Sequence, residues 1–247
     1  MSNASWRVPF GDLKIGPIAA RYIERAVVKN WISEGDNVRE FERRFADKFG
    51  WRHAIATSSG TDAGIVVWSA IRELAGKEVD VRHASGIVGH GSISDCYGAV
   101  ITPACAFAAT ANCILASGLV PMFNDVRLGD LNIDPDLVDT LVTNNGVLGI
   151  QFVATMGKPT PIMEIAEVAD QHHLYLVGDW CEAHGSYFQT VPMPGKEWTA
   201  KYGGTWQYAD HLCDAAIYSF YAAHMIVAGE GGMICTDDDK IAELCRS

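Results

Sequence analysis

Several short segments of the sequence place chemically useful residues in turns that follow apolar runs. The first, SSGTDAG at residues 58–64, puts Gly60 and Thr61 at the start of a helical pattern. Free backbone amides at a helix N-terminus, a glycine that permits close approach and a hydroxyl side chain together suit a phosphate group. An ordinary helix capped by Ser59 would have the same sequence, so this segment alone leaves both interpretations open.

An aromatic residue and a carboxylate also follow apolar runs. Phe107 lies in PACAFAATAN, directly after AVIT, where its ring is either a stacking surface for a flat heterocycle or part of the core. Asp179 ends the run LYLVGD, and a carboxylate in such a position is rarely buried without a partner. Asp179 could hold a protonated pyridine nitrogen, which makes the ring an electron sink; the alternative is a helix cap.

Histidines supply the candidate groups for proton transfer. Ser219 and His224 lie in SFYAAHMIVAGEGG, where the glycines let the chain return tightly. An imidazole with an unperturbed pKa of about 6.5 transfers protons well near neutral pH. His184 in CEAHGS is either a proton relay or a structural histidine. His83 and His90 lack Cys or carboxylate partners on a regular element, so we predict no metal site.

These residues require a scaffold that brings strand ends together. Apolar spacing predicts amphipathic helices at residues 17–31 and 37–49, and it predicts long loops at 76–97 and 186–209. Helical patterns alternate with short apolar runs, which predicts an α/β fold with a mainly parallel seven-stranded sheet and helices on both faces. Ligands on such sheets bind at the carboxyl ends of the strands. The predicted strands are residues 53–57, 99–102, 119–123, 146–153, 174–179, 215–220 and 231–236.

Composition excludes several classes of protein. A formal net charge of −11, without a cluster of Lys and Arg, argues against a nucleic-acid partner. No apolar run reaches the roughly 18 residues of a membrane span, and the N-terminus lacks a signal-peptide core, so we expect no membrane partner and a cytoplasmic protein. The seven scattered cysteines form no CxxC pair, which argues against disulfides or a closed zinc site.

The succession of these segments resembles the DegT/DnrJ/StrS family of sugar aminotransferases and their dehydratase relatives. The similarity runs from about Phe10 to the end of the chain, interrupted by the two predicted loops, and includes the FNDV and NIDP segments within 123–135. It implies the three-layer α/β/α large domain of pyridoxal-phosphate-dependent transferase fold type I at residues 35–240. Residues 1–34 would be an N-terminal arm and helix, and the family's C-terminal small domain would be absent or truncated after residue 247. Family members are homodimers.

The resemblance also implies a cofactor, pyridoxal 5'-phosphate (PLP) or pyridoxamine 5'-phosphate (PMP), and a role for each motif residue. Glu182 stands where the family usually has Gln or Asp near the ring hydroxyl. The other implied contacts are the cofactor phosphate for Gly60, Thr61 and Ser219, ring stacking for Phe107, and the ring nitrogen for Asp179.

His224 departs from the aminotransferase pattern. It occupies the position of the lysine that holds the cofactor as a Schiff base, and imidazole forms no stable Schiff base. The histidine matches the family's 3-dehydratase branch, whose substrates are nucleotide-linked 4-keto-6-deoxyhexoses. In that branch the cofactor amine would condense with the C4 ketone, His224 would remove a proton, and the C3 hydroxyl would leave while Asp179 keeps the ring nitrogen protonated.

Alternatives to a dehydratase stay open. They are a sugar aminotransferase and a catalytically inactive, cofactor-binding relative or fragment. The nucleotide is undetermined, and so is whether glutamate or a reductase restores the amine form. Cys181 matches a position that supplies one cluster ligand in the iron-sulfur branch of these dehydratases, which neither supports nor excludes a cluster in a longer protein.

Overall fold

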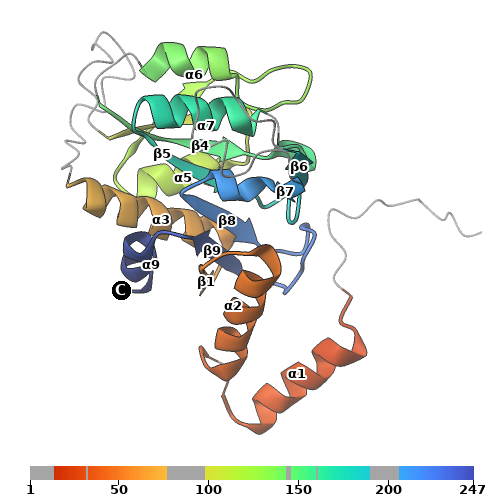
Figure 1. The fold of residues 1–247 in the computed structure, drawn as a ribbon. Helices are drawn as coiled ribbons and strands as arrows, with labels where there is room; N and C mark the ends of the chain where they lie inside the picture. The colour runs from red at the N-terminus through yellow and green to blue at the C-terminus, as the bar shows by residue number, and fades with distance from the viewer. Residues whose placement is uncertain (1–13, 32, 77–97, 143–145, 160, 190–205) are drawn as a thin grey trace, which may run out of the picture.

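A seven-stranded sheet forms the centre of the computed structural model, with the strand order β1-β9-β8-β5-β4-β2-β3 (Figure 1). All seven strands coincide with the predicted apolar runs, which confirms the predicted α/β class and strand count. The structure describes residues 14–247 except 32, 77–97, 143–145, 160 and 190–205. The strands are β1 (His53–Thr57), β2 (Ala99–Pro103), β3 (Val120–Asn124), β4 (Val147–Val153), β5 (Tyr175–Asp179), β8 (Ala215–Ser219) and β9 (Gly232–Thr236).

The strand directions bring the motifs to one edge of the sheet. Strands β3, β2, β4, β5 and β8 are parallel to their neighbours in that part of the sheet, whereas β9 is antiparallel to both β8 and β1. Strand β1 therefore runs in the same direction as β8. The segments that follow β1, β2, β5 and β8 all leave the sheet at its carboxyl edge, where ligands of parallel sheets bind.

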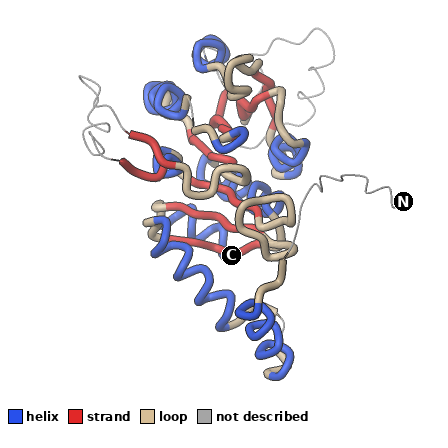
Figure 2. Tube along the Cα trace, turned by 90° about the vertical axis from the view of Figure 1, so that its right-hand side faces the viewer, coloured by secondary structure: helices blue, strands red, loops and turns tan. Residues whose placement is uncertain are grey.

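Helices cover the two faces of the sheet (Figure 2). Buried side chains between the helices and the sheet form two hydrophobic cores. The core that includes Trp68 is closed by α3 (Gly60–Ala75), α5 (Ala108–Ala116) and α9 (Asp239–Arg246). The other core, which includes Phe152, is closed by α2 (Asp36–Phe49), α6 (Pro135–Val142) and α7 (Ile162–Gln171). This arrangement gives the three layers expected of the fold.

The first helix, α1 (Pro17–Val28), stands away from the sheet (Figure 1). Pro17 lies in its first turn, where a proline ring fits the helix start without loss of a hydrogen bond. The helix ends three residues before the predicted boundary, because Asn30 adopts a left-handed conformation with φ of 53°. None of the α1 residues is buried, although several are apolar.

The prediction of one long loop at residues 186–209 is wrong at both ends. Tyr187–Gln189 (β6) and Trp206–Tyr208 (β7) form a two-stranded antiparallel sheet, and a short 3-10 helix, η4 (Ala209–Leu212), follows. Strands of three residues are too short to show a period in the sequence. Residues 190–205 lie outside the described residues, and so do residues 77–97 of the loop predicted at 76–97, which include His83 and His90.

None of the described helices combines the length and the apolarity that crossing a lipid bilayer requires.

Candidate active site

The start of α3 meets the end of β8 at Gly60. Ser59 caps the helix, because its Oγ accepts a hydrogen bond from the amide of Asp62 at 3.1 Å. The amides of the first helical residues, Gly60 and Thr61, have no acceptor within the helix. A Cβ atom on Gly60 would lie 2.7 Å from Cβ of Ser219 and 3.3 Å from Sγ of Cys181. Only glycine fits here, so the predicted phosphate-binding segments are in contact.

Asp179 ends β5 at the same edge, with both carboxylate oxygens engaged. Its Oδ1 accepts a hydrogen bond from the Cys181 amide at 3.1 Å, and its Oδ2 accepts one from Oγ1 of Thr110 at 3.2 Å. Two donors from different segments fix the carboxylate in one orientation. Cys181 also touches the position where Gly60 would carry a Cβ, so it joins the carboxylate to the start of α3.

Phe107 lies one turn before Thr110, at the entry to α5. The amide of Thr110 donates to the carbonyl oxygen of Phe107 at 2.9 Å. The side chain of Phe107 is 78% exposed, so the interpretation of this residue as part of the core is wrong. An exposed ring three residues from Thr110, which binds the Asp179 carboxylate, is able to stack on a flat heterocycle.

The turn between β8 and β9 carries His224. Ser219 is buried at the end of β8, and its Oγ accepts a hydrogen bond from the Tyr221 amide at 3.3 Å. The amide of His224 donates to the carbonyl of Tyr221 at 3.0 Å, and the two rings meet edge to face with centroids 6.3 Å apart. His224 is half-buried, so its imidazole is both held by the turn and open to solvent.

His184 is a second, deeply buried imidazole close to this turn. It stacks on Tyr218 and Phe220 with centroid distances of 5.3 Å and 5.9 Å. Neither ring nitrogen has a hydrogen-bond partner among the described residues. Burial, with a smaller effect of repulsion from His224, lowers the pKa of His184 from 6.5 to about 4. His184 is therefore a neutral imidazole near physiological pH.

Glu182 lies three residues after Asp179, with its side chain exposed. Its Oε2 accepts a hydrogen bond from the amide of Met156 at 2.6 Å. No feature of the sequence connects residue 156 with residue 182. Thr110 is also missed by the sequence analysis, although its place in the ATAN segment next to Phe107 is a signal that could have identified it.

Cys181 is a thiol rather than a thiolate in this environment. Burial raises its pKa well above the usual value, and the nearby Asp179 raises it further. A protonated thiol is a poor nucleophile and a poor metal ligand. Within the part of the chain that the structure describes, no three His, Cys, Asp or Glu side chains come together as a metal site.

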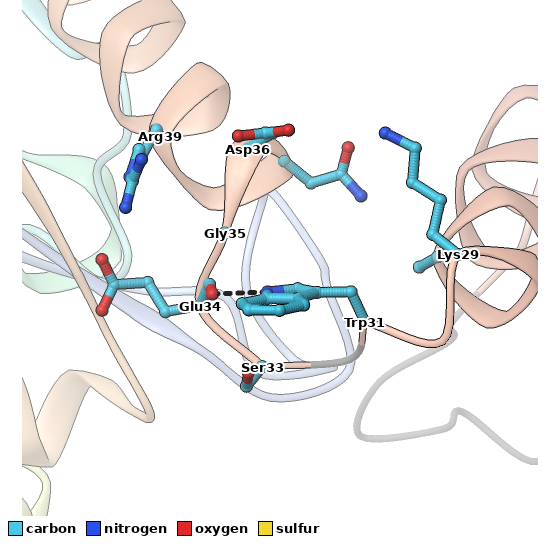
Figure 3. Close-up of a pocket in the computed structure, with 9 residues that line it drawn as sticks. Lys29, Trp31, Ser33, Glu34, Gly35, Asp36 and Arg39 are labelled. Carbon is cyan, nitrogen blue, oxygen red and sulfur yellow. Dashed lines mark hydrogen bonds between the residues drawn. The ribbon is translucent and has the colours of Figure 1, made fainter.

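A separate hollow of about 360 Å³ lies where α1 turns into α2, and Figure 3 shows its lining. Lys29, Trp31 and Arg39 are among the residues around it. The Nε1 atom of Trp31 donates to the carbonyl of Glu34 at 2.7 Å, which closes the turn between the helices. None of the predicted site residues contributes to this hollow, so it is distinct from the edge described above.

Known proteins share both the sequence pattern and the fold. The profile of the DegT/DnrJ/EryC1/StrS aminotransferase family matches residues 15–87 and 91–247. The dTDP-4-dehydro-2,6-dideoxy-D-glucose 3-dehydratase of Saccharopolyspora spinosa is 34% identical over 216 residues, which are 87% of this chain and 40% of that protein.

Two solved structures illustrate the likeness in fold. NtdA from Bacillus subtilis with bound cofactor PMP has a TM-score of 0.68 and 26% identity, over 92% of this chain and 42% of that one. A GDP-4-keto-6-deoxymannose-3-dehydratase has a TM-score of 0.74 and 21% identity, over 97% of this chain and 54% of that one.

The chain thus spans about half the length of the proteins it matches. The profile match nevertheless extends over nearly all of its residues, on both sides of a short gap. The chain belongs to the DegT/DnrJ/EryC1/StrS aminotransferase family.

Proposed function

We propose that this chain supplies the cofactor-binding part of a PMP/PLP-dependent enzyme that removes the C3 hydroxyl of a nucleotide-linked 4-keto-6-deoxyhexose. The observation that carries the proposal is the meeting of Gly60, Ser219 and Asp179 at one sheet edge, with His224 in the adjoining turn. The 34% identity to a sugar 3-dehydratase supports the reaction type. Deoxysugar biosynthesis is the corresponding biological process.

The site residues fit the cofactor. Gly60 lies against Ser219 and has no side chain, so none projects from the first residue of α3, which suits the binding of a phosphate ester by the helix amides. Thr61 adds a hydroxyl at the same helix start. Asp179, already fixed by two donors, would pair with the pyridine nitrogen, and the exposed ring of Phe107 would stack on the heterocycle. Glu182 would face the ring hydroxyl.

His224 would be the proton-transfer group. When bound, PMP supplies an amine for the sugar ketone and a ring that accepts electrons. His224 has no primary amine with which to form a Schiff base. Its imidazole would instead take up a proton and donate one to the departing C3 hydroxyl, which leaves as water. Its place in a turn held by Tyr221 keeps the imidazole at the sheet edge. Asp179 would keep its partner nitrogen protonated throughout.

Further parts of the proposal concern the assembled protein. Residues 35–240 would form the cofactor-binding domain and residues 1–34 an arm and helix, in accord with the position of α1 away from the sheet. Because the chain spans about half the length of its relatives, the complete activity is proposed for a protein that also has their remaining segments. We further propose a cytoplasmic homodimer, with glutamate or a reductase as the source of renewed PMP.

A titration with PMP and with PLP, followed by absorbance, tests the proposal. The unmodified protein should bind PMP, and it should form no borohydride-reducible bond to PLP. His224→Lys should gain such a bond, and Asp179→Asn should bind PMP about tenfold or more weakly, because a charge-assisted hydrogen bond is lost. A reducible bond to PLP in the unmodified protein would instead indicate an aminotransferase. Binding of neither cofactor would favour a fragment without independent function.

A further inference from the structure

A tight turn after β4 lies between a buried asparagine and the site. The turn is the 3-10 helix η3 (Thr155–Gly157). On its inner side, Oδ1 of Asn132 accepts a hydrogen bond from the Thr155 amide, and Nδ2 of Asn132 donates to the carbonyl of Lys158, each at 3.0 Å. Asn132 is completely buried. One side chain therefore binds the backbone on both sides of the turn.

The outer side of the same turn contacts the segment that follows Asp179. The amide of Met156 donates to Oε2 of Glu182 at 2.6 Å, and Oγ of Ser186 donates to the carbonyl of Gly157 at 3.0 Å. The carbonyl of Glu182 also lies 3.4 Å from where a Cβ on Gly157 would be. The turn is thus bound between the buried asparagine and the segment containing Glu182.

Met156 adopts a backbone conformation that the turn must enforce. Its φ of 55° and ψ of 28° are left-handed, which is unfavourable for a residue with a Cβ. The Met156 side chain is 73% exposed, so its own packing does not hold this conformation. The hydrogen bonds of Asn132 to the flanking residues, together with the backbone bonds of the turn and the contact from Ser186, hold the Met156 amide directed at Glu182.

We propose that Asn132 is a positioning residue that acts through the Thr155–Gly157 turn to hold the carboxylate of Glu182 at the cofactor edge. The Met156 amide occupies Oε2, so Oε1 is directed to accept a second hydrogen bond from a ligand hydroxyl such as a phenol. The inference rests on the proposed function only in taking that hydroxyl to be the one on the pyridine ring. The link from Asn132 to Glu182 does not depend on a bound cofactor, because residues of this chain make all of its hydrogen bonds.

Hydrogen exchange of the Met156 amide, measured by NMR without cofactor, tests the link directly. Asn132→Ala should speed exchange of this amide about tenfold or more, relative to amides within β4. The matched control is Ser117→Ala, which also removes a buried polar side chain with two backbone contacts, to Ile65 and Cys113 at 3.0 Å and 2.7 Å. This control should leave Met156 exchange unchanged relative to β4. Unchanged exchange in Asn132→Ala would overturn the proposal.

Asn132→Asp separates the two contacts of the side chain. It keeps the acceptor for Thr155 and loses the donor to Lys158, so exchange of the Met156 amide should lie between the values for the unmodified protein and Asn132→Ala. Exchange as fast as in the alanine variant would still place the link at Asn132, through the Lys158 contact. Exchange slower than in the unmodified protein would contradict the proposal.

A double-mutant cycle with PMP tests the consequence for the site. Asn132→Ala and Glu182→Ala should each weaken PMP binding about tenfold, and the double variant should lose little more than either single one, because both act on one contact. Additive losses would overturn the positioning role. If the unmodified protein binds no PMP, the proposed function fails, whereas the exchange experiment still decides the link between Asn132 and Glu182.

Discussion

Gly60 and Ser219 pack so closely that no side chain can stand between them. A Cβ on Gly60 would lie 2.7 Å from Cβ and 3.3 Å from Cα of Ser219. Gly60 begins α3, and Ser219 ends β8, two strands away from β1 in the sheet. The contact makes one surface from two segments that are distant in the sequence, and it sets the shape of the proposed phosphate site.

Replacement of Gly60 by alanine should disrupt this surface. We expect Gly60→Ala to lower the free energy of unfolding by about 1–3 kcal/mol, as is usual for an overpacked contact, and to weaken PMP binding at least tenfold. Denaturant unfolding and absorbance titration measure the two effects. Gly129→Ala is the control, because a Cβ there would have no atom within 4 Å. PMP binding by Gly60→Ala equal to that of the unmodified protein would contradict the placement of the phosphate.

Thr110 should matter to the site more than to the fold. Thr110→Val keeps the shape of the side chain but removes the hydroxyl that donates to Oδ2 of Asp179. Because hydrogen bonds to charged groups contribute about 1.5–3 kcal/mol, PMP should bind roughly tenfold or more weakly. Thr140→Val on α6, whose hydroxyl donates to the Asp136 carbonyl at 3.0 Å, should leave binding unchanged. Equal affinities in both variants would exclude a role for Thr110.

His184 should make the stability of the protein depend on pH. Its pKa is about 4 in the folded protein against an ordinary value of 6.5, so between these values the unfolded chain binds a proton that the folded protein does not. The stabilising effect is complete above pH 6.5 and is lost as the pH falls toward 4. The loss should reach up to about 3 kcal/mol.

His184→Phe provides the comparison that isolates this residue. Phenylalanine can stack on Tyr218 and Phe220 but does not titrate, so the variant should lose less stability than the unmodified protein between pH 6.5 and 4. Other titrating groups are common to both proteins and cancel in the difference. Denaturant midpoints measured at several pH values provide the test, and parallel profiles would be inconsistent with a buried, neutral His184.

A buried polar pair inside one of the cores should contribute to the stability of the fold and not to cofactor binding. Nε1 of Trp68 donates to Oε1 of Gln151 at 2.6 Å, and both side chains are almost completely buried. Gln151→Leu would leave the indole N–H without an acceptor, at a cost of about 1–3 kcal/mol. Gln171→Leu, at an exposed position on α7, should change the unfolding free energy much less. Similar losses in the two variants would contradict this account.

Local patterns in the sequence predicted most of the scaffold. The apolar run 174–179 and its counterparts became strands because each combines β-forming residues with flanking turns, which are local properties. The family resemblance, rather than the apolar pattern, implied that Gly60 and Ser219 serve one site, and the structure brings the two residues into contact. By contrast, β6 and β7 went unpredicted, because strands of three residues are stabilised by each other rather than by their own pattern.

The identity of contacting residues was the part that only the tertiary structure decided. From the sequence, Asp179 and His224 were candidates and Phe107 had two interpretations, one of which its exposure excludes. The hydrogen bonds from Thr110 to Asp179 and from Met156 to Glu182 depend on the strand order β5-β4-β2, which no single segment encodes. Residue type and spacing determine which chemistry is available. Long-range packing determines which groups come within hydrogen-bonding distance, because it depends on all the elements together.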